Sequence, residues 1–267
     1  MNPEQILIAG LALLFGASVG SFLNVVIHRL PIGESLISPP SRCPGCRKGI
    51  AWHDNLPVVG WLVLRGRCRT CNAPISPRYP IVEGVTALVA LALVTAHGPG
   101  LEFAGAFYFA CTLIALTYID LDHQILPDRL TLPGIAIGLV IAAAAPPGTW
   151  PTPLPTAFVG ALVGGGILWL VAWTYHLVTG REGMGGGDVK LLAMIGAFLG
   201  WKGVLLTLLL SSFIGSVIGV GLMLRHRADG RLAIPFGPFL ALGAMVTLFW
   251  GDRIVRWYMS SLGFPPG

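Results

Sequence analysis

The sequence predicts an all-α polytopic membrane protein with about eight transmembrane helices and a small, zinc-ribbon-like cytoplasmic insert. Composition is the first observation behind this fold class. Of the 267 residues, 54% are hydrophobic and only 11% are charged, whereas a soluble domain carries about 25% charged residues. The second observation is that the apolar residues form several runs long enough to cross a bilayer.

The first apolar run begins near Gln5 and continues to about Ile27. Because it lacks a preceding basic segment and a small-residue cleavage site, we expect a first transmembrane helix and no cleaved signal. The full set of expected spans is 5–28, 80–97, 101–121, 130–146, 156–178, 189–200, 203–224 and 237–257. The sixth is short for the roughly 20 residues that a span needs. It either starts inside a cavity at Asp188 or forms a helical hairpin with the seventh.

The distribution of Lys and Arg predicts the orientation. If eight spans alternate, 14 of the 17 Lys and Arg residues fall on one face, eight of them between Arg29 and Arg78. The positive-inside rule places that face in the cytoplasm. We therefore expect both termini outside the cytoplasm, and the net charge of +5 requires no nucleic-acid partner.

The polar stretch 31–79 contains two C-x-x-C pairs, separated by 21 residues. Four thiolates in this spacing suit a tetrahedral zinc ion, so we expect structural zinc. The ligands would be Cys43, Cys46, Cys68 and Cys71. Disulfides and redox dithiols are the alternatives, and a cytoplasmic location disfavours disulfides. The chain then divides into a first transmembrane helix (1–30), a tetracysteine insert (31–79) that metal binding helps to fold, and a membrane core (80–267).

Two acidic motifs lie at the edges of apolar segments, where a carboxylate costs roughly 2.5–3.5 kcal/mol on insertion scales. One motif runs from Asp120 through Asp122 to Asp128, and the other places Asp188 after three glycines. Both fall on the same predicted face at the same depth, so a shared site is expected. Asp120 and Asp122 point in nearly opposite directions on a helix, so only one of them can face Asp188.

Paired carboxylates that share a proton are the machinery of aspartic proteolysis. The ionised carboxylate takes a proton from water, the protonated one polarises the scissile carbonyl, and the water attacks without a covalent intermediate. Each aspartate also has a structural interpretation. Asp188 or Asp128 fits a helix cap, and Asp120 or Asp122 fits an interfacial charge that ends a helix.

Three further residues near the membrane edges or on apolar helices are ambiguous. Glu83 fits either an interfacial charge near Arg78 or a role in the acidic site or the insert. Asn24 fits a hydrogen bond to a neighbouring helix. Cys111 stands alone on an apolar run and fits packing.

Together these residues resemble the bacterial prepilin peptidases, the bifunctional leader peptidase and N-methyltransferase of type IV pilus and type II secretion systems. The resemblance spans almost the whole chain and its motifs are specific. It rests on segments 20–26 and 29–31, both cysteine pairs, 74–80 with Glu83, 120–128, 183–191 and 235–239.

The resemblance implies a multi-pass protein of the bacterial inner membrane whose active site faces the cytoplasm. Such a protein removes the basic leader from type IV prepilins and type II secretion pseudopilins, after a Gly and usually before a Phe. It then methylates the new N-terminus with S-adenosyl-L-methionine, and the family associates the insert with methylation. The family's catalytic aspartates fall on Asp120 and Asp188, with Asp122 as the alternative to Asp120. The sequence predicts neither a methyl-donor site nor an oligomeric state.

Two other functions fit parts of the pattern. Intramembrane carboxylates and glycine-broken helices also mark cation- or proton-coupled transporters. Against this, no inverted repeat is evident, and both acidic motifs lie near one face and not at the midplane. A membrane scaffold that holds partners through its zinc insert is the second alternative.

Overall fold

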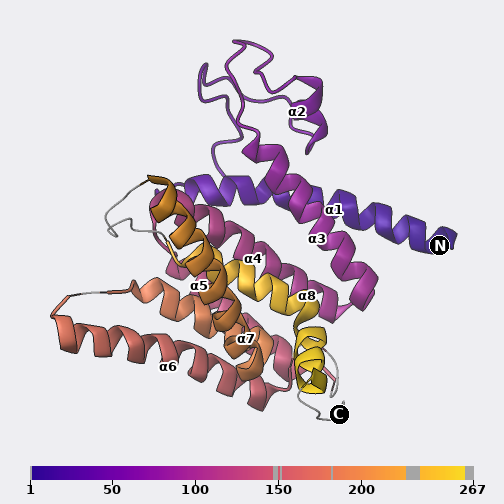
Figure 1. Cartoon of the computed structure of the whole chain (residues 1–267). Helices are drawn as coiled ribbons and strands as arrows, with labels where there is room; N and C mark the ends of the chain where they lie inside the picture. Colours follow the sequence, from indigo (N-terminus) through magenta and orange to yellow (C-terminus); the bar gives the residue numbers. More distant parts are fainter. Residues whose placement is uncertain (1, 147–149, 151, 182, 227–234, 262–267) are drawn as a thin grey trace. The chain divides into compact units, whose positions relative to one another are not determined.

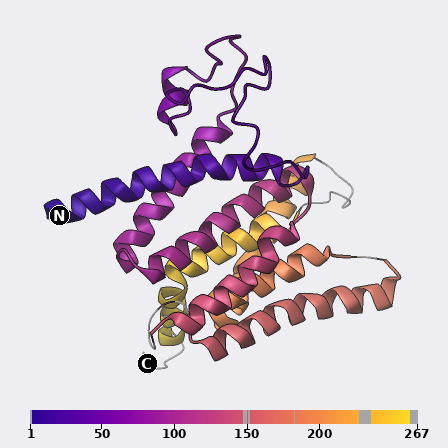
Figure 2. The same cartoon turned by 180° about the vertical axis from the view of Figure 1, so that it is seen from behind.

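The structure is a computed structural model that describes residues 2–146, 150, 152–181, 183–226 and 235–261. These residues form eight helices and no strand beyond two isolated bridges, Arg42 with Gly49 and Arg67 with Pro74. Figures 1 and 2 show them from opposite sides. The helices are α1 (Pro3–Arg29), α2 (Val59–Val63), α3 (Arg78–His97), α4 (Leu101–His123), α5 (Asp128–Ala144), α6 (Leu154–Thr179), α7 (Gly186–His226) and α8 (Gly237–Ser261).

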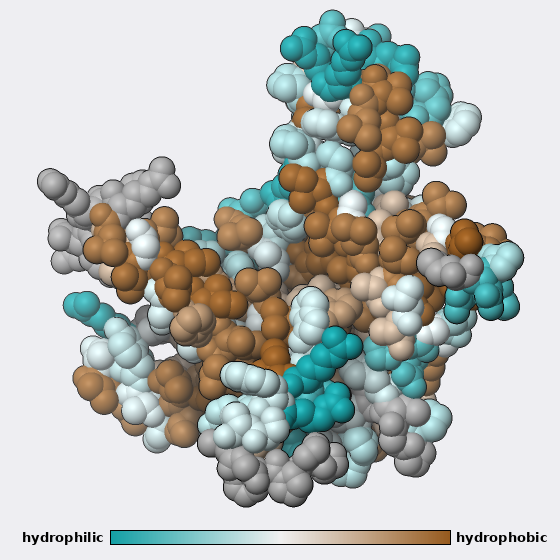
Figure 3. Space-filling view, turned by 45° about the vertical axis from the view of Figure 1, so that its right-hand side comes forward, coloured by the Kyte–Doolittle hydropathy of each residue, from teal (hydrophilic) through white to brown (hydrophobic). Residues whose placement is uncertain are grey.

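Each of the eight expected spans falls on a helix, although the fourth extends past the end of α5 at Ala144 and the sixth includes the non-helical Gly200. Within the described ranges, six helices are long and apolar enough to cross a membrane, namely α1, α3, α4, α6, α7 and α8. Helix α7 contains both the sixth and the seventh expected span, and α5 accounts for the fourth with 17 residues. Large apolar side chains also point outward, such as Leu14 and Leu209 at 69% and 66% exposure, and they cover much of the helical surface in Figure 3. The prediction of an all-α polytopic membrane protein is confirmed.

The chain divides into two compact units, Met1–Ala115 and Leu116–Gly267. The first holds α1, α2 and α3, the insert and most of α4. The second holds the C-terminal end of α4 and helices α5 to α8. Because α4 belongs to both, its last turns with Asp120 fold with the second unit.

In the first unit, α1 and α3 approach closely at small residues. A Cβ added at Gly20 would lie 2.6 Å from the Cα of Glu83, and one at Gly16 would lie 2.7 Å from the Cα of Ala87. Small residues at such contacts allow membrane helices to pack backbone against backbone. One turn beyond Gly20, the side-chain amide of Asn24 donates a hydrogen bond of 3.2 Å to the carbonyl of Tyr79 in α3. The expected interhelical bond of Asn24 is therefore confirmed.

In the second unit, α7 is broken at Gly200, whose φ of 68° and ψ of 178° are not helical. The left-handed φ suits glycine, because other residues seldom adopt it. The half of α7 before the break packs against α6. There Gly160 and Gly196 lie so close that a Cβ on either would overlap the other's carbonyl group.

The half of α7 after Gly200 packs against α8 in the opposite direction. Ser211 donates a hydrogen bond of 2.9 Å to the carbonyl of Phe239 near the start of α8, and Thr207 contacts Thr247 further along it at 3.3 Å. The start of α8 adjoins Leu126, which also contacts the start of α7. The second half therefore returns to the end where α7 began, so the two spans form a helical hairpin, one of the two arrangements that the sequence left open.

Candidate functional site

Three segments of the second unit meet around Leu126, which is 8% exposed. A Cβ added at Gly187, in the first turn of α7, would lie 2.9 Å from the Cβ of Leu126. One added at Gly237, the first residue of α8, would lie 3.3 Å from its Cδ2. The loop after α4 and the starts of α7 and α8 are thus packed together, and this brings the two acidic motifs to one place.

The two aspartates of the motifs lie at this junction. Asp120 is in the last turn of α4 and is 5% exposed. Asp188 is in the first turn of α7 and is half-buried. The carboxylates are close enough to interact electrostatically. The shared site expected from the sequence is consistent with this arrangement.

Each carboxylate has a distinct environment. The backbone amide of Gly237 is a hydrogen-bond partner of Asp120, and a Cβ on that glycine would lie 2.5 Å from Asp120 Oδ2. The Oδ1 atom of Asp188 is buried and has no hydrogen-bond partner among the described residues. An unpartnered buried oxygen is costly unless something else occupies the site. Asp188 is therefore placed to bind a water molecule or a substrate group.

Asp122 and Asp128 have different surroundings from the buried Asp120. Asp122 is exposed, two residues beyond buried Asp120, as the opposite directions of neighbouring helical positions predict. Asp128 is the first residue of α5, and its Oδ1 accepts a bond of 2.6 Å from Lys190 Nζ in α7. Asp128 thus ties the start of α5 to the first turn of α7, next to the junction.

The four cysteines of the insert form the second candidate site. Their sulfur atoms all lie within 4.8 Å of one another, and the Sγ atoms of Cys43 and Cys71 are 3.7 Å apart. A tetrahedron with Zn–S bonds of about 2.3 Å has edges of about 3.8 Å. The donor set and its spacing therefore fit a four-coordinate metal ion.

The two cysteine pairs have the same backbone structure. The amide of Cys43 donates to the carbonyl of Lys48 and that of Arg47 donates to Cys43, at 3.0 and 2.8 Å. In the second pair, Cys68 donates to Ala73 and Asn72 donates to Cys68, at 2.9 and 3.0 Å. Arg47 and Asn72 also share a left-handed φ of 57°. We call each of these turns a knuckle.

Within the second knuckle, the backbone favours the thiolate form of Cys68. The backbone N–H groups of Cys71 and Thr70 point at the Cys68 thiol and lower its pKa to about 6. Metal ligands must be deprotonated, so this backbone geometry prepares Cys68 to bind a cation.

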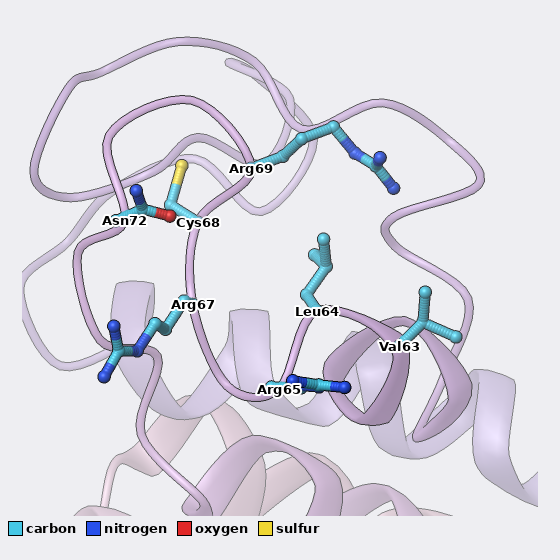
Figure 4. A pocket seen from close by; sticks show the side chains of 7 residues that line it. All are labelled: Val63, Leu64, Arg65, Arg67, Cys68, Arg69 and Asn72. Atoms are coloured by element: carbon cyan, nitrogen blue, oxygen red, sulfur yellow. The ribbon is translucent and has the colours of Figure 1, made fainter.

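A cavity of about 500 Å³ lies beside the second knuckle, and Figure 4 shows its lining. Val63, Leu64 and Arg65 come from the end of α2 and the residues after it. Arg67, Cys68, Arg69 and Asn72 come from the knuckle. Arg69 makes a bidentate pair with Asp54, with Nη2 to Oδ1 at 2.6 Å, and this hydrogen bond lowers the pKa of Asp54. The other two charged residues of the lining, Arg65 and Arg67, are also cationic.

Sequence reasoning left Glu83 open, and the structure shows it buried at 7% exposure. Its Oε2 accepts a hydrogen bond of 2.6 Å from the amide of Val58, immediately before α2. Glu83 thus contacts the insert and is not an exposed interfacial charge. Cys111 is buried in α4, outside the sulfur cluster.

Two residues of these sites had no assigned role in the sequence analysis. Gly237 belongs to the quoted segment 235–239, but nothing in the sequence connects it with Asp120, which is more than a hundred positions away. Val58 carries no local signal, since an apolar residue after proline is common. Only the folded chain reveals these two contacts.

The comparisons with known proteins cover both sites. The family model described as Bacterial Peptidase A24 N-terminal domain matches residues 14–97, and the Type IV leader peptidase family matches residues 107–220. The chain belongs to the type IV leader peptidase family. The first match includes all four clustered cysteines, and the second includes Asp120 and Asp188. The resemblance stated from the sequence is confirmed.

Full-length relatives of this type IV leader peptidase carry the name prepilin leader peptidase/N-methyltransferase. The protein of Aeromonas hydrophila is 44% identical over 275 residues, which are 94% of this chain and 93% of the relative. That of Pseudomonas aeruginosa is 41% identical over 275 residues, with 94% and 93% covered. That of Xanthomonas campestris is 40% identical over 278 residues, with 96% and 94% covered. No solved structure matches the chain.

Proposed function

We propose that this chain is a prepilin leader peptidase and N-methyltransferase. It removes the basic leader from type IV prepilins and from type II secretion pseudopilins, after a Gly and usually before a Phe, and it then methylates the new N-terminus. The observation that carries the peptidase function is the convergence of two carboxylates from different helices at one junction. Membership of the family and the names of the relatives support both activities.

Asp120 and Asp188 are the catalytic pair of this proposal. Two neighbouring carboxylates share one proton more easily than both ionise. The ionised member takes a proton from the attacking water while the protonated member donates a hydrogen bond to the scissile carbonyl. When the tetrahedral intermediate collapses, the C–N bond breaks and the leaving amine takes up a proton. The unpartnered Oδ1 of Asp188 is available to hold the water.

Asp120 is favoured over Asp122 as the partner. It is buried beside Gly237, whereas Asp122 is exposed. A catalytic carboxylate works best where water is largely excluded, because hydrogen bonds and charges act more strongly there. The burial therefore supports the first aspartate of the motif.

Gly237 gives this proposal a specific test. In Gly237→Ala the new Cβ would lie 2.5 Å from Asp120 Oδ2, so the carboxylate must turn away from its position. We expect prepilin cleavage to fall by about 10- to 100-fold, since small displacements of catalytic groups are costly. The rate of leader removal in proteoliposomes measures this.

Gly219→Ala is the matched control for that substitution. Gly219 lies in α7 and no atom lies within 4 Å of a Cβ built on it, so cleavage should stay near the wild-type rate. Wild-type cleavage by Gly237→Ala would remove the support that this contact gives to Asp120.

The cysteine cluster holds structural zinc in this proposal. Cys43, Cys46, Cys68 and Cys71 supply four sulfur ligands that close the coordination sphere, as in other structural sites. The two knuckles come from distant parts of the insert, so the metal joins them. The methyl group comes from S-adenosyl-L-methionine when that molecule is bound. The role of the insert is to help bind the donor and orient the amine.

The location follows from the charge distribution and the family. We propose a bacterial inner-membrane protein whose Lys- and Arg-rich face, with the insert and the aspartate junction, lies in the cytoplasm. Its lipid-facing surface is the apolar exterior of the helices. A transporter or a scaffold is not favoured by any contact described above.

Mass spectrometry of a prepilin tests both activities at once. The purified full-length protein is reconstituted in liposomes with a prepilin and S-adenosyl-L-methionine. We expect the product to lose the leader mass and to gain one methyl group. A prepilin recovered intact would exclude the peptidase, and a processed but unmethylated product would exclude the second activity.

A further inference from the structure

A buried carboxylate in the first unit plays no part in the peptidase mechanism. Glu83 accepts a hydrogen bond from the Val58 amide, and the Ser21 hydroxyl is its other hydrogen-bond partner. In the part of the chain that the structure describes, Glu83 forms no ion pair with a Lys, Arg or His side chain. Neutral donors alone hold this carboxylate, although a buried charge is much more favourable with a countercharge nearby.

The backbone that contacts Glu83 is strained. Val58 has a φ of 60° and a ψ of −49°, a conformation that is unfavourable for a β-branched residue. Strain of this kind persists where surrounding structure enforces it, and it is concentrated at binding and catalytic sites. The bond of 2.6 Å from Val58 to Glu83 is one contact that holds the strained backbone in place.

A cavity of about 320 Å³ adjoins this group. It is lined by Ser18, Ser21, Phe22, Val25, Ser41, Asn55 and Pro57. Ser21 both lines the cavity and bonds Glu83, and Pro57 directly precedes Val58. The lining offers hydroxyl groups, an amide and an aromatic ring, and it contains no charged side chain. Its volume is within the range of small-ligand sites, roughly 300–1,000 Å³.

We infer that this cavity binds a small organic cation, with Glu83 supplying the compensating negative charge. This inference rests on the proposed N-methyltransferase activity, whose reactants offer two such cations: the sulfonium of S-adenosyl-L-methionine and the ammonium form of the N-terminus to be methylated. The carboxylate attracts either through a low-dielectric environment, and a cation placed over the face of the Phe22 ring would be favoured further.

The larger cavity beside the second knuckle is a poorer site for the same ligand. Arg65, Arg67 and Arg69 line it, and among the described residues only Arg69 of these three is paired with a carboxylate, that of Asp54. S-adenosyl-L-methionine carries two positive groups and one negative, so these guanidinium groups would repel it. The charge of the lining thus distinguishes the two cavities.

Equilibrium binding to the full-length protein in detergent tests the inference without using activity. The probes are S-adenosyl-L-methionine and its neutral thioether product, S-adenosylhomocysteine, which lacks only the methyl group and the charge. We expect Glu83→Gln to weaken binding of the sulfonium by roughly tenfold and to change thioether binding much less. Thioether binding also reports that the variant is folded. Glu34→Gln, an exposed carboxylate of the same insert, should leave both affinities unchanged.

A second arm identifies the source of the cation. A peptide with the processed pilin N-terminus, with a free or an acetylated amine, is titrated in the presence of the thioether. If the ammonium occupies the cavity, Glu83→Gln lowers the preference for the free over the acetylated amine. The preference for the sulfonium over the thioether then stays unchanged. Should Glu83→Gln bind nothing, Phe22→Leu decides, because loss of the ring should lower one of the two preferences.

The inference would be overturned if Glu83→Gln changed neither of the two preferences. If that variant binds nothing, the same result in Phe22→Leu would overturn it. Failure of the proposed function looks different. In that case the wild-type protein itself would bind neither the sulfonium nor the thioether.

Discussion

Asp188→Asn and Asp120→Asn are each expected to lower prepilin cleavage by at least about a thousandfold. Asparagine keeps the shape of the side chain but cannot take a proton from water or share one with a partner. Positioned acid–base groups contribute roughly 10²–10⁴-fold each, and the two members of a pair act as one unit. The measurement is the rate of leader removal in proteoliposomes at substrate concentrations below saturation.

Asp122→Asn is the matched control for Asp120→Asn. The two positions are two residues apart on α4, and Asp122 is exposed whereas Asp120 is buried. Cleavage by Asp122→Asn should remain within about threefold of wild type, as for most exposed substitutions. Loss of activity in Asp122→Asn with activity retained in Asp120→Asn would reverse the assignment. Full activity in both Asp188→Asn and Asp120→Asn would refute the aspartic mechanism.

Replacing one clustered cysteine is expected to empty the metal centre. The purified protein should contain about one zinc ion per chain, held by four sulfur ligands. In Cys43→Ser the site loses a thiolate whose sulfur lies 3.7 Å from that of Cys71, and we expect less than about 0.1 zinc per chain. Because metal binding contributes folding free energy in small sites of this kind, the insert should also become sensitive to protease.

Cys111→Ser provides the control, since this cysteine is buried in α4 and lies outside the cluster. Elemental analysis gives the metal content of both variants, and limited proteolysis maps the cleavage sites within 31–79. Unchanged zinc in Cys43→Ser would reject the ligand assignment. An intact insert after removal of zinc by a chelator would show that its folding does not depend on the metal.

The fold was largely predictable because the bilayer imposes a strong pattern on a sequence. A span must be helical, since every backbone group needs an internal partner, so the apolar runs alone located all eight segments. The cysteine spacing was similarly informative, because four ligands in two short turns leave few possible coordination geometries for a metal ion. The break in α7 was less certain, and the contacts of α8 were needed to establish the hairpin.

The candidate sites were predictable only in part, for a physical reason. Local sequence marks a costly group such as Asp120 or Asp188, but it does not show what that group touches. The contact of Gly237 with Asp120, and that of Val58 with Glu83, depend on how distant segments pack. The choice between Asp120 and Asp122 likewise depends on burial, which the tertiary structure decides.

The matching knuckles also bear on how the first two long helices stay together. The insert is the tether between Arg29 at the end of α1 and Arg78 at the start of α3, two helices that pack against each other. When a metal ion joins Cys43 to Cys71, the residues between these two cysteines no longer count toward the loop that connects the helices. The remaining loop is less than half as long. Because loop-closure entropy grows with the logarithm of loop length, this shortening favours the helix pair by about 0.7 kcal/mol. A metal ion bound by the insert thus strengthens the association of α1 with α3 inside the bilayer without contacting either helix.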